Sequence, residues 1–262
     1  MTAGFVVGLL ALLGLGGLGF LVRPRPFPSV TLPAAAVSSG DLPADLPAPV
    51  ARYLRTVLGG QLPGYRTAIL TGRIRLRFSP LRLPARFRFY YAVGQGYHHT
   101  IEITWFGFPV GRVEENYNRG RSHFNLLGRV IDDDPAVNRA ANMGLWAEMI
   151  WLPFAYADPA VRWEAVDANS ARLHFPFGEE EDSLLFTFDP ATGLPTECFG
   201  MRQRAAGAPF TGWRNAIRRW GTLSGVQMPL VAETIWVDQG YAWAVWQVED
   251  VCYGADVAQW LP

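Results

Sequence analysis

The sequence predicts an α+β protein that is mainly antiparallel β, in which a curved, many-stranded meander wraps on a central helix as an unclosed barrel. Three observations support this class. Apolar residues beyond residue 72 recur mostly at every second position, which is typical of half-buried strands. The spacing changes to that of a helix once, close to residues 135–153. Strands and helices do not alternate and no internal repeat appears, so neither a parallel sheet nor a repeat protein is indicated.

The composition fits one large globular domain behind a short membrane segment. Half of the 262 residues are hydrophobic, which is enough for a sizeable core. The sequence contains no Lys, and its arginines balance its acids, so the net charge is zero. Proteins whose main partner is nucleic acid usually carry a basic excess, and we therefore expect no nucleic-acid partner. We divide the chain into an anchor at 1–22, a Pro-rich tether at 23–46 and a single β-rich domain at 47–262.

The N-terminal segment predicts one transmembrane helix ahead of the domain. Residues 3–22 include no charged side chain, and a helix of this length spans about 30 Å, the thickness of the hydrocarbon core of a bilayer. A cleaved signal peptide is the alternative, with a candidate cleavage site at 34–36, but no basic residue precedes the apolar run. We expect an uncleaved, single-pass anchor. Arg23 and Arg25 favour a cytoplasmic domain, although two charges leave the side of the membrane open.

A short amphipathic helix is predicted at 49–58, where the tether ends. Gly59 and Gly60 follow it and favour a helix end. Such a helix usually docks against a sheet, although a basic amphipathic helix beside a membrane can also lie on the membrane surface. Its apolar face consists of Val50, Tyr53, Leu54 and Val57.

Two strands with a basic outer face follow, at 73–78 and 86–91. Apolar and Arg side chains alternate along both strands, and the first acid after the tether is Glu102. One interpretation is a solvated sheet face whose acidic partners come from the next strands, among them Glu102, Glu114 and Glu115. The other interpretation is a surface that contacts anionic lipid headgroups. The candidate residues for this membrane surface are Arg73, Arg75, Arg77, Arg86 and Arg88.

A central helix is predicted between two sets of strands. Asp134 suits the N-cap and Pro135 the first turn, so capping explains the acids at 132–134 better than a metal site does. The small residues Ala141 and Gly144 favour close approach of this helix to the sheet. Further strands are predicted close to residues 99–106, 111–118 and 121–127 before the helix, and 161–167, 171–177, 183–189, 195–203, 210–221, 228–237 and 241–252 after it.

Glu148 is the one acid on the apolar stripe of the central helix. A lone charged carboxylate is too costly in apolar surroundings, so it must be paired, hydrogen-bonded or protonated. Glu148 could pair with an arginine or a Trp N–H of the sheet, hold the headgroup of a ligand, or act as a general acid or base. Catalysis would require a second titratable group within hydrogen-bond reach of Glu148 in a cleft. The candidate arginine partners are Arg162, Arg202, Arg214 and Arg218.

Common motifs for catalysis and metal binding are absent from the sequence. It contains no G-x-S-x-G nucleophile elbow, no H-E-x-x-H, no C-x-x-C and no P-loop. His98 and His99 are adjacent on a predicted strand and point to opposite faces, so they cannot share a metal ion. We therefore expect no metal, no cofactor and no catalytic residue. Cys198 and Cys252 are too few for a disulfide framework, and whether they pair is open.

The sequence resembles an uncharacterised bacterial family of domains that follow an N-terminal membrane segment. The shared motifs are E-x-x-W-L-P at 148–153, V-R-W-E at 161–164 and the later runs FDPATGLP and GVQMPLVAETIW. The resemblance covers residues 47–253 and implies a location at the bacterial cell membrane but no activity. More loosely, a meander closed over a helix is similar to the unclosed barrels of LolA and LppX lipoprotein carriers, which hold acyl chains. The chain departs from such lipoproteins because it lacks a lipobox Cys.

We expect the domain to bind a hydrophobic or amphiphilic molecule, such as a lipid, between the concave sheet and the helix. The many aromatic residues, the membrane segment and the likeness to lipoprotein carriers favour this function. A fully packed interaction or scaffold domain at the membrane is the alternative, and a hydrolase-like enzyme that uses Glu148 is the third hypothesis. The oligomeric state is open. The candidate ligand-binding residues are Glu148, Trp146, Trp151, Arg162 and Arg202.

Overall fold

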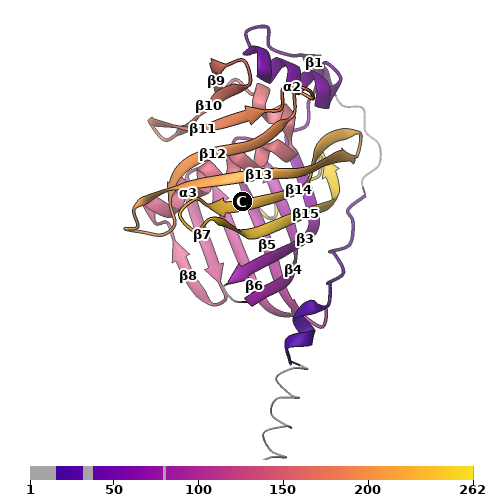
Figure 1. Ribbon diagram of the computed structural model, residues 1–262, viewed down its shortest axis with the longest axis vertical. Coiled ribbons are helices and arrows are strands. Elements are labelled where there is room, and N and C mark those ends of the chain that lie inside the picture. The colour runs from indigo at the N-terminus through magenta and orange to yellow at the C-terminus, as the bar shows by residue number, and fades with distance from the viewer. Residues whose placement is uncertain (1–15, 32–37, 79–80, 262) are drawn as a thin grey trace, which may run out of the picture.

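The computed structural model describes residues 16–31, 38–78 and 81–261. These residues form helix α2 (Ala48–Leu58), helix α3 (Pro135–Glu148), a small sheet and a thirteen-stranded sheet (Figure 1). The small sheet pairs β1 (Ser39–Asp41) with β2 (Gln61–Pro63). The strands of the large sheet are β3 (Thr67–Phe78), β4 (Leu81–Ala92), β5 (Gly96–Trp105), β6 (Phe108–Asn118), β7 (Arg121–Leu126), β8 (Arg129–Asp132), β9 (Arg162–Asp167), β10 (Ser170–Phe177), β11 (Glu180–Phe188), β12 (Pro195–Gln203), β13 (Phe210–Leu223), β14 (Val226–Trp236) and β15 (Tyr241–Tyr253).

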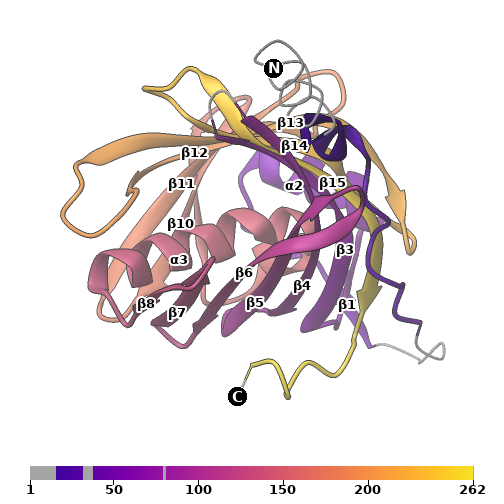
Figure 2. The same cartoon turned by 90° about the horizontal axis from the view of Figure 1, so that it is seen from below.

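The large sheet consists of two antiparallel meanders joined edge to edge. Strands β3 to β8 pair in chain order, strands β9 to β15 do the same, and β3 pairs with β15. The outer strands β8 and β9 are not hydrogen-bonded to each other, so the barrel stays open. The predicted curved, unclosed antiparallel meander is therefore confirmed. Figure 2 shows the sheet arching around α3.

Helix α3 lies on the concave side because it belongs to the connection between the two outer strands. Its start is as predicted: the Asp134 carboxylate accepts hydrogen bonds from two backbone N–H groups of the first turn, each at 3.0 Å, and Pro135 is the first helical residue. The helix ends earlier than predicted, at Glu148. The chain then continues as short 3-10 helices over Met149–Trp151 and Pro153–Ala157, which packs Trp151 beneath the sheet.

Helix α2 docks on the sheet instead of lying free. Its predicted apolar face is buried in the main hydrophobic core, which fills the concave side. Gly59 adopts a φ of 67°, and its N–H group donates a hydrogen bond to the Arg55 carbonyl at 3.0 Å, which ends the helix. The left-handed conformation is available to glycine without strain, and this explains why the helix stops there.

The two ends of the described chain pack on the convex face of the sheet. In the C-terminal tail, Trp260 stacks on Tyr90 of β4, with ring centroids 4.2 Å apart. Residues 23–28 of the predicted tether cross the same face, where they receive a hydrogen bond from Arg88 and a cation–π contact from Arg86. This part of the segment therefore contacts the domain.

Every strand predicted from the sequence is present. The short strands β1, β2 and β8 were not predicted, because three or four residues are too few to show an alternating pattern. Among the described residues, no helix is long and apolar enough to cross a membrane. Most of the anchor predicted at 3–22 lies outside the described residues, which begin at residue 16.

Candidate functional site

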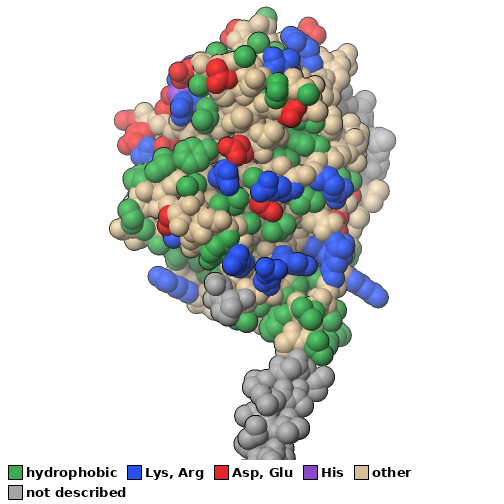
Figure 3. All heavy atoms as spheres, viewed as in Figure 1, with side chains coloured by type: hydrophobic (Ala, Val, Ile, Leu, Met, Phe, Trp, Pro, Cys, Tyr) green, Lys and Arg blue, Asp and Glu red, His purple; other side chains and the backbone are tan. Residues whose placement is uncertain are grey.

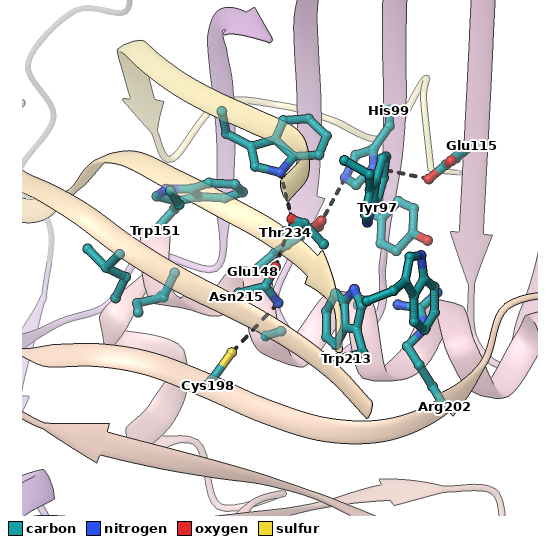
Figure 4. A pocket seen from close by; sticks show the side chains of 18 of the residues that line it. Tyr97, His99, Glu115, Glu148, Trp151, Cys198, Arg202, Trp213, Asn215 and Thr234 are labelled. Carbon is teal, nitrogen blue, oxygen red and sulfur yellow. Dashed lines mark hydrogen bonds and ion pairs between the residues drawn. The ribbon is translucent and has the colours of Figure 1, made fainter. Parts of the chain in front are cut away.

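A largely apolar cavity of about 140 Å³ lies between α3 and the concave face of the sheet (Figure 4). Toward the start of α3 it meets an outer groove of about 760 Å³. Tryptophans from the chain after α3 and from three strands dominate the cavity wall: Trp151, Trp213, Trp236, Trp243 and Trp246. The residues that line both the cavity and the outer groove are Glu115, Phe124, Arg202, Trp236 and Trp243.

Glu148, the last residue of α3, contacts Tyr91 of β4 and His99 of β5. The Tyr91 hydroxyl donates a hydrogen bond to Glu148 Oε2 at 3.0 Å, and His99 Nε2 lies 3.3 Å from the same oxygen. The ring N–H is not aligned for a hydrogen bond, so the second contact is an ion pair. On the other side of the ring, His99 Nδ1 lies 3.7 Å from Oε2 of Glu115. The imidazole thus lies between two carboxylates.

The register of the sheet places His99 at this position. Phe89, His99 and Glu115 are direct cross-strand neighbours on β4, β5 and β6. The His99 ring stacks between Phe89 and Tyr97, with centroid distances of 3.7 and 4.0 Å. The residue is only 3% exposed. Because the two aromatic rings fix the plane of the imidazole, both ring nitrogens are held toward the carboxylates.

The carboxylates around His99 change its protonation. Burial alone lowers the pKa of a histidine, because it disfavours the charged ring. Here the carboxylates of Glu148 and Glu115 outweigh burial, and the pKa of His99 is raised above its ordinary value. Burial and the neighbouring Glu148 raise the pKa of Tyr91, which therefore stays a neutral hydrogen-bond donor.

A row of polar side chains crosses the opposite wall of the cavity. Trp246 Nε1 donates to Thr234 Oγ1 at 2.8 Å, and Thr234 Oγ1 donates to Asn215 Oδ1 at 2.8 Å. Asn215 Nδ2 donates to Cys198 Sγ at 3.7 Å. Burial raises the pKa of the Cys198 thiol to about 12, so this sulfur is not a thiolate nucleophile at neutral pH.

Arg202 of β12 lies where the cavity meets the outer groove, and it has no carboxylate partner among the described residues. Its buried Nε atom also lacks a hydrogen-bond acceptor. The guanidinium carbon lies 4.6 Å from the ring centroid of Trp213 and 5.8 Å from that of Trp236. Burial lowers the pKa of this guanidinium. The negative charges of Glu115 and Glu148 oppose this lowering from a distance. Arg202 is therefore a cation supported by aromatic rings, without a direct ion pair in the described part of the chain.

The structure brings some of the predicted ligand-binding residues together and leaves others apart. Trp146 packs on the other side of α3 against Phe175, with ring centroids 6.0 Å apart, and does not line the cavity. Arg162 is on the surface and pairs with Glu181 at 2.9 Å. The predicted residues that do line the cavity are Glu148, Trp151 and Arg202.

None of the candidate arginines forms an ion pair with Glu148, so this alternative is not what the structure shows. Arg214 pairs with Glu197 and Arg218 with Glu233, so both are engaged elsewhere on the sheet. The helical period identifies the face on which Glu148 lies but not the strands opposite the end of the helix. Those strands are β4 and β5, which supply a tyrosine and a histidine.

The small size of Gly144 predicted that the helix approaches the sheet closely at this residue, and the structure shows no such close approach. A methyl group added at Gly144 would contact only Arg202 Nη1, at 3.7 Å. The glycine faces the cavity, so its lack of a side chain leaves cavity space open.

The basic strand face is partly neutralised within the protein. Arg73 pairs with an acid of β15, Arg86 pairs with an acid of β5, and Arg88 donates to a backbone carbonyl of the N-terminal segment. Arg77 lies over the ring of Tyr241, at 3.9 Å from its centroid. Arg75 is exposed, and neither Arg75 nor Arg77 forms an ion pair with an acid in the described ranges.

The three acids that were expected to pair with the basic strand face each have a different partner. Glu102 pairs with Arg86 at 2.7 Å, as predicted. Glu114 instead pairs with Arg112 of its own strand, and Glu115 faces the cavity beside His99. Glu114 and Glu115 were therefore wrongly expected to neutralise the arginines of the two preceding strands.

Metal and disulfide chemistry finds no support in the described part of the chain. It holds no group of three His, Cys, Asp or Glu side chains arranged to bind a metal ion. His98 and His99 do lie on opposite faces of the sheet, as predicted. Cys198 belongs to the main core and Cys252 to a smaller cluster on the convex face, so the two do not form a disulfide.

Sequence reasoning missed Tyr91, His99 and Glu115 as site residues. The signal for His99 was available, because the alternating pattern puts His99 on the same face as Tyr97 and Ile101. A histidine on the inner face of a strand needs a polar partner, and Glu148 needed one as well. The pairing itself depends on how the strands curve around the end of α3, which the alternating pattern does not contain.

An open antiparallel sheet curved around one helix, with an apolar cavity beneath that helix, defines the class of this protein. Within this class the chain belongs to DUF6544, a family of unknown function, which it matches over residues 35–248. No curated protein matches the sequence. The predicted resemblance to an uncharacterised family is thereby confirmed.

Three solved structures are similar in outline. A DUF1329 family protein from Desulfovibrio piger is 11% identical over 75% of this chain and 90% of its own, with a TM-score of 0.46. An outer membrane lipoprotein-sorting protein domain from Vibrio parahaemolyticus, described as putative, is 10% identical over 74% of this chain and 88% of its own, with a TM-score of 0.42. A LolA superfamily protein from Nitrosomonas europaea is 10% identical over 74% of this chain and 89% of its own, with a TM-score of 0.45. The expected likeness to LolA-type proteins is confirmed, but similarity at this level says nothing about function.

Proposed function

We propose that this domain binds an amphiphilic molecule with an acidic headgroup between α3 and the concave sheet. The observation that carries this proposal is Arg202, a half-buried cation that forms no ion pair with an acid among the described residues, at the junction of an apolar cavity and a wider groove. A buried charge is costly unless it is paired, and an acidic ligand group would supply the missing partner.

The other charges of the site also favour a ligand whose acidic headgroup lies at Arg202. Glu148 and Glu115 already share His99, whereas Arg202 lies against aromatic rings and forms no ion pair with an acid among the described residues. Arg77 in the outer groove also lacks an acidic partner among the described residues. An acidic headgroup would therefore lie at Arg202 on the groove side, with the apolar chain among the tryptophans.

The dimensions fit a ligand that occupies both spaces. Ligand sites commonly measure about 300 to 1,000 Å³. The cavity, at about 140 Å³, is smaller than this range, and the outer groove, at about 760 Å³, lies within it. A molecule with a chain in the cavity and its head in the groove would use both. A fully packed scaffold domain is correspondingly less favoured.

The proposal is tested with laurate and dodecanol, which have equal chain lengths but differ in headgroup. Native mass spectrometry of the detergent-solubilised full chain measures the binding of each, and extraction identifies co-purified lipid. We expect laurate to bind more tightly, and Arg202→Met to weaken laurate about 10-fold to 100-fold, as loss of a charge-assisted hydrogen bond predicts. Arg162→Met, an equal change away from the cavity, should have no effect. If neither compound binds and no lipid co-purifies, the proposal fails.

Acid–base catalysis is the second candidate function, because Glu148 has a titratable partner within reach. His99 Nε2 lies 3.3 Å from Glu148 Oε2 at the edge of the cavity, so two titratable groups lie within reach of a molecule bound there. The chromogenic ester p-nitrophenyl laurate tests it. Hydrolysis by the native chain and loss of hydrolysis in Glu148→Gln would favour this function, and no hydrolysis above background would remove it.

We propose a location at the bacterial cell membrane, with residues 1–22 as a single-pass anchor and the domain in the cytoplasm. The support is the uncharged sequence at 3–22 followed by Arg23 and Arg25. A membrane location would also give the cavity access to amphiphiles.

A further inference from the structure

Three consecutive hairpins of the large sheet expose apolar side chains at their turns. These hairpins are β3–β4, β5–β6 and β7–β8, and we call the edge formed by their turns the hairpin end. Large apolar side chains at this edge are between 39% and 73% exposed. Exposed large apolar side chains gathered at one edge mark an interaction site on a soluble domain. The exposed residues are Phe78, Leu81, Trp105, Phe106, Phe108 and Leu127.

The three turns share one edge because of the order of the strands. Strands β3, β5 and β7 alternate with antiparallel partners, so all three run in one direction and turn back at the same edge. The N-terminal segment meets this edge. Trp105 Nε1 donates to the Gly16 carbonyl at 2.8 Å, and the Phe106 N–H group donates to the Gly19 carbonyl at 2.8 Å. Figure 1 shows the segment arriving beneath the strands.

Arginines lie beside the hairpin end, and Figure 3 shows them gathered above the N-terminal segment. A groove of about 510 Å³ between residues 20–24 and the sheet is lined by Arg23, Arg75 and Arg82. Of these, Arg75 and Arg82 form no ion pair with any acid that the structure describes. Trp is enriched at the membrane–water interface, Phe and Leu occur with Trp on the apolar faces of segments that lie in it, and arginines are attracted to anionic headgroups. The hairpin end combines both features.

The outer groove of the cavity opens at this same edge. Phe78 at the end of β3 and Leu126 at the end of β7 line the groove and also adjoin the exposed turns. Ile131 of β8 and Tyr241 of β15 complete that side of the mouth. Whatever covers the hairpin end therefore lies next to the entrance of the cavity.

We propose that the hairpin end docks on the surface of an anionic lipid bilayer and holds the mouth of the cavity against it. Two observations favour a bilayer over a protein partner: the unpaired arginines beside the aromatic turns, and the uncharged sequence at 3–15 that leads into Gly16 at this edge. The role of the mouth in ligand transfer rests on the proposed ligand binding. The docking of the hairpin end on a bilayer does not depend on that proposal. An amphiphile would then pass between bilayer and cavity without crossing bulk water.

The docking is measured with a fluorescent label on the full chain in nanodiscs of phosphatidylglycerol and phosphatidylcholine. Phe108→Cys carries an NBD label, and lipids with a spin label near the headgroup quench it on contact. Val166→Cys on β9 is the matched control, because Val166 is also an exposed apolar strand residue but lies on the outer strand farthest from the hairpin end in the sheet order. The unsubstituted chain, whose two cysteines are buried, gives the labelling background.

We expect the label at 108 to be quenched several-fold more strongly than the label at 166. Quenching should weaken when phosphatidylglycerol is omitted or when Arg75 and Arg82 are replaced by Gln. Equal quenching at both positions overturns the proposal. A label at 108 that is shielded from water only at high protein density, without lipid quenching, would assign the surface to a second copy of the chain and also overturn it. Strong quenching at 108 together with no laurate binding would remove the proposed function and leave the docking intact.

Discussion

Glu148 lies half-buried at the cavity beneath the sheet, and two side chains from neighbouring strands compensate for its partial burial. Tyr91 donates a hydrogen bond to the carboxylate, and His99 forms an ion pair with the same oxygen. Two stacked rings hold His99 in place, and Glu115 faces its other nitrogen. Removing one member leaves the others with unsatisfied polar atoms, so the group behaves as a unit.

Replacing Glu148 by Gln should lower the pKa of His99, because burial then opposes protonation with only Glu115 to offset it. A raised histidine pKa stabilises the fold fully below the unfolded value of about 6.5, and this stabilisation is lost as the pH rises through the folded pKa. The melting temperature of the native chain should therefore be highest below about pH 6.5 and fall as the pH rises through the folded pKa of His99, and that of the variant should fall less. Histidine NMR titrations follow the pKa directly.

The same variant should be less stable at the acidic end of this range, by about 1 to 3 kcal/mol, the usual cost of an unsatisfied buried polar group. His99→Gln is the control, since it removes the titrating group and should flatten the pH dependence. An identical pH dependence in the native chain and in Glu148→Gln would show that the carboxylate does not control His99.

At the scale of elements, α3 reaches from the outer groove to the carboxylate that contacts Tyr91 and His99. Its first turn is capped by Asp134, its middle faces the cavity at Gly144, and its last residue is Glu148. The helix also brings one charged residue, Glu148, and two small residues, Gly144 and Ala147, to the cavity. The helix is thus both part of the core and part of the cavity wall.

Gly144→Ala should stabilise the protein by about 0.5 to 1 kcal/mol, because alanine loses less backbone freedom than glycine in a helix. Space permits the methyl group, which would meet only Arg202 Nη1 at 3.7 Å. Urea unfolding measures the stability. The methyl would also narrow the cavity, so laurate should bind less tightly. A loss of stability would indicate that Arg202 cannot move aside, and unchanged laurate binding would place the ligand elsewhere.

At the scale of the whole molecule, the open sheet creates the cavity. Its edges β8 and β9 remain unpaired with each other, and the connection between them folds inward as α3 instead of completing a barrel. In a small closed barrel the side chains alone fill the interior, whereas here a helix and side chains share a wider space. The remaining space is the cavity and its outer groove.

Saturation with laurate should stabilise the whole domain. A ligand at about 100 times its Kd adds about 2.7 kcal/mol to the free energy of unfolding when it binds only the native state. We expect a rise in Tm of several degrees by circular dichroism in detergent, a smaller rise with dodecanol, and little rise with laurate in Arg202→Met. A uniform rise in all three samples would point to an effect of the detergent mixture.

Much of the fold could be predicted, because alternation and helix capping are local properties. The alternating runs predicted strands that are present, and Asp134 with Pro135 predicted the start of α3. The site was predicted in part. Glu148, Trp151 and Arg202 line the cavity, whereas Trp146 and Arg162 do not, because a pattern assigns a residue to a face without saying what covers that face.

The sequence by itself determined that strands alternate in polarity, that a capped helix interrupts them once, and that an acid lies on the buried stripe of that helix. These features follow from interactions within a few residues of the chain. Only the tertiary structure decided that Glu148 meets Tyr91 and His99, that Arg202 has no acidic partner in the described chain, and that three hairpin turns share one apolar edge. Each of these depends on strand register and sheet curvature, which join residues far apart in the sequence.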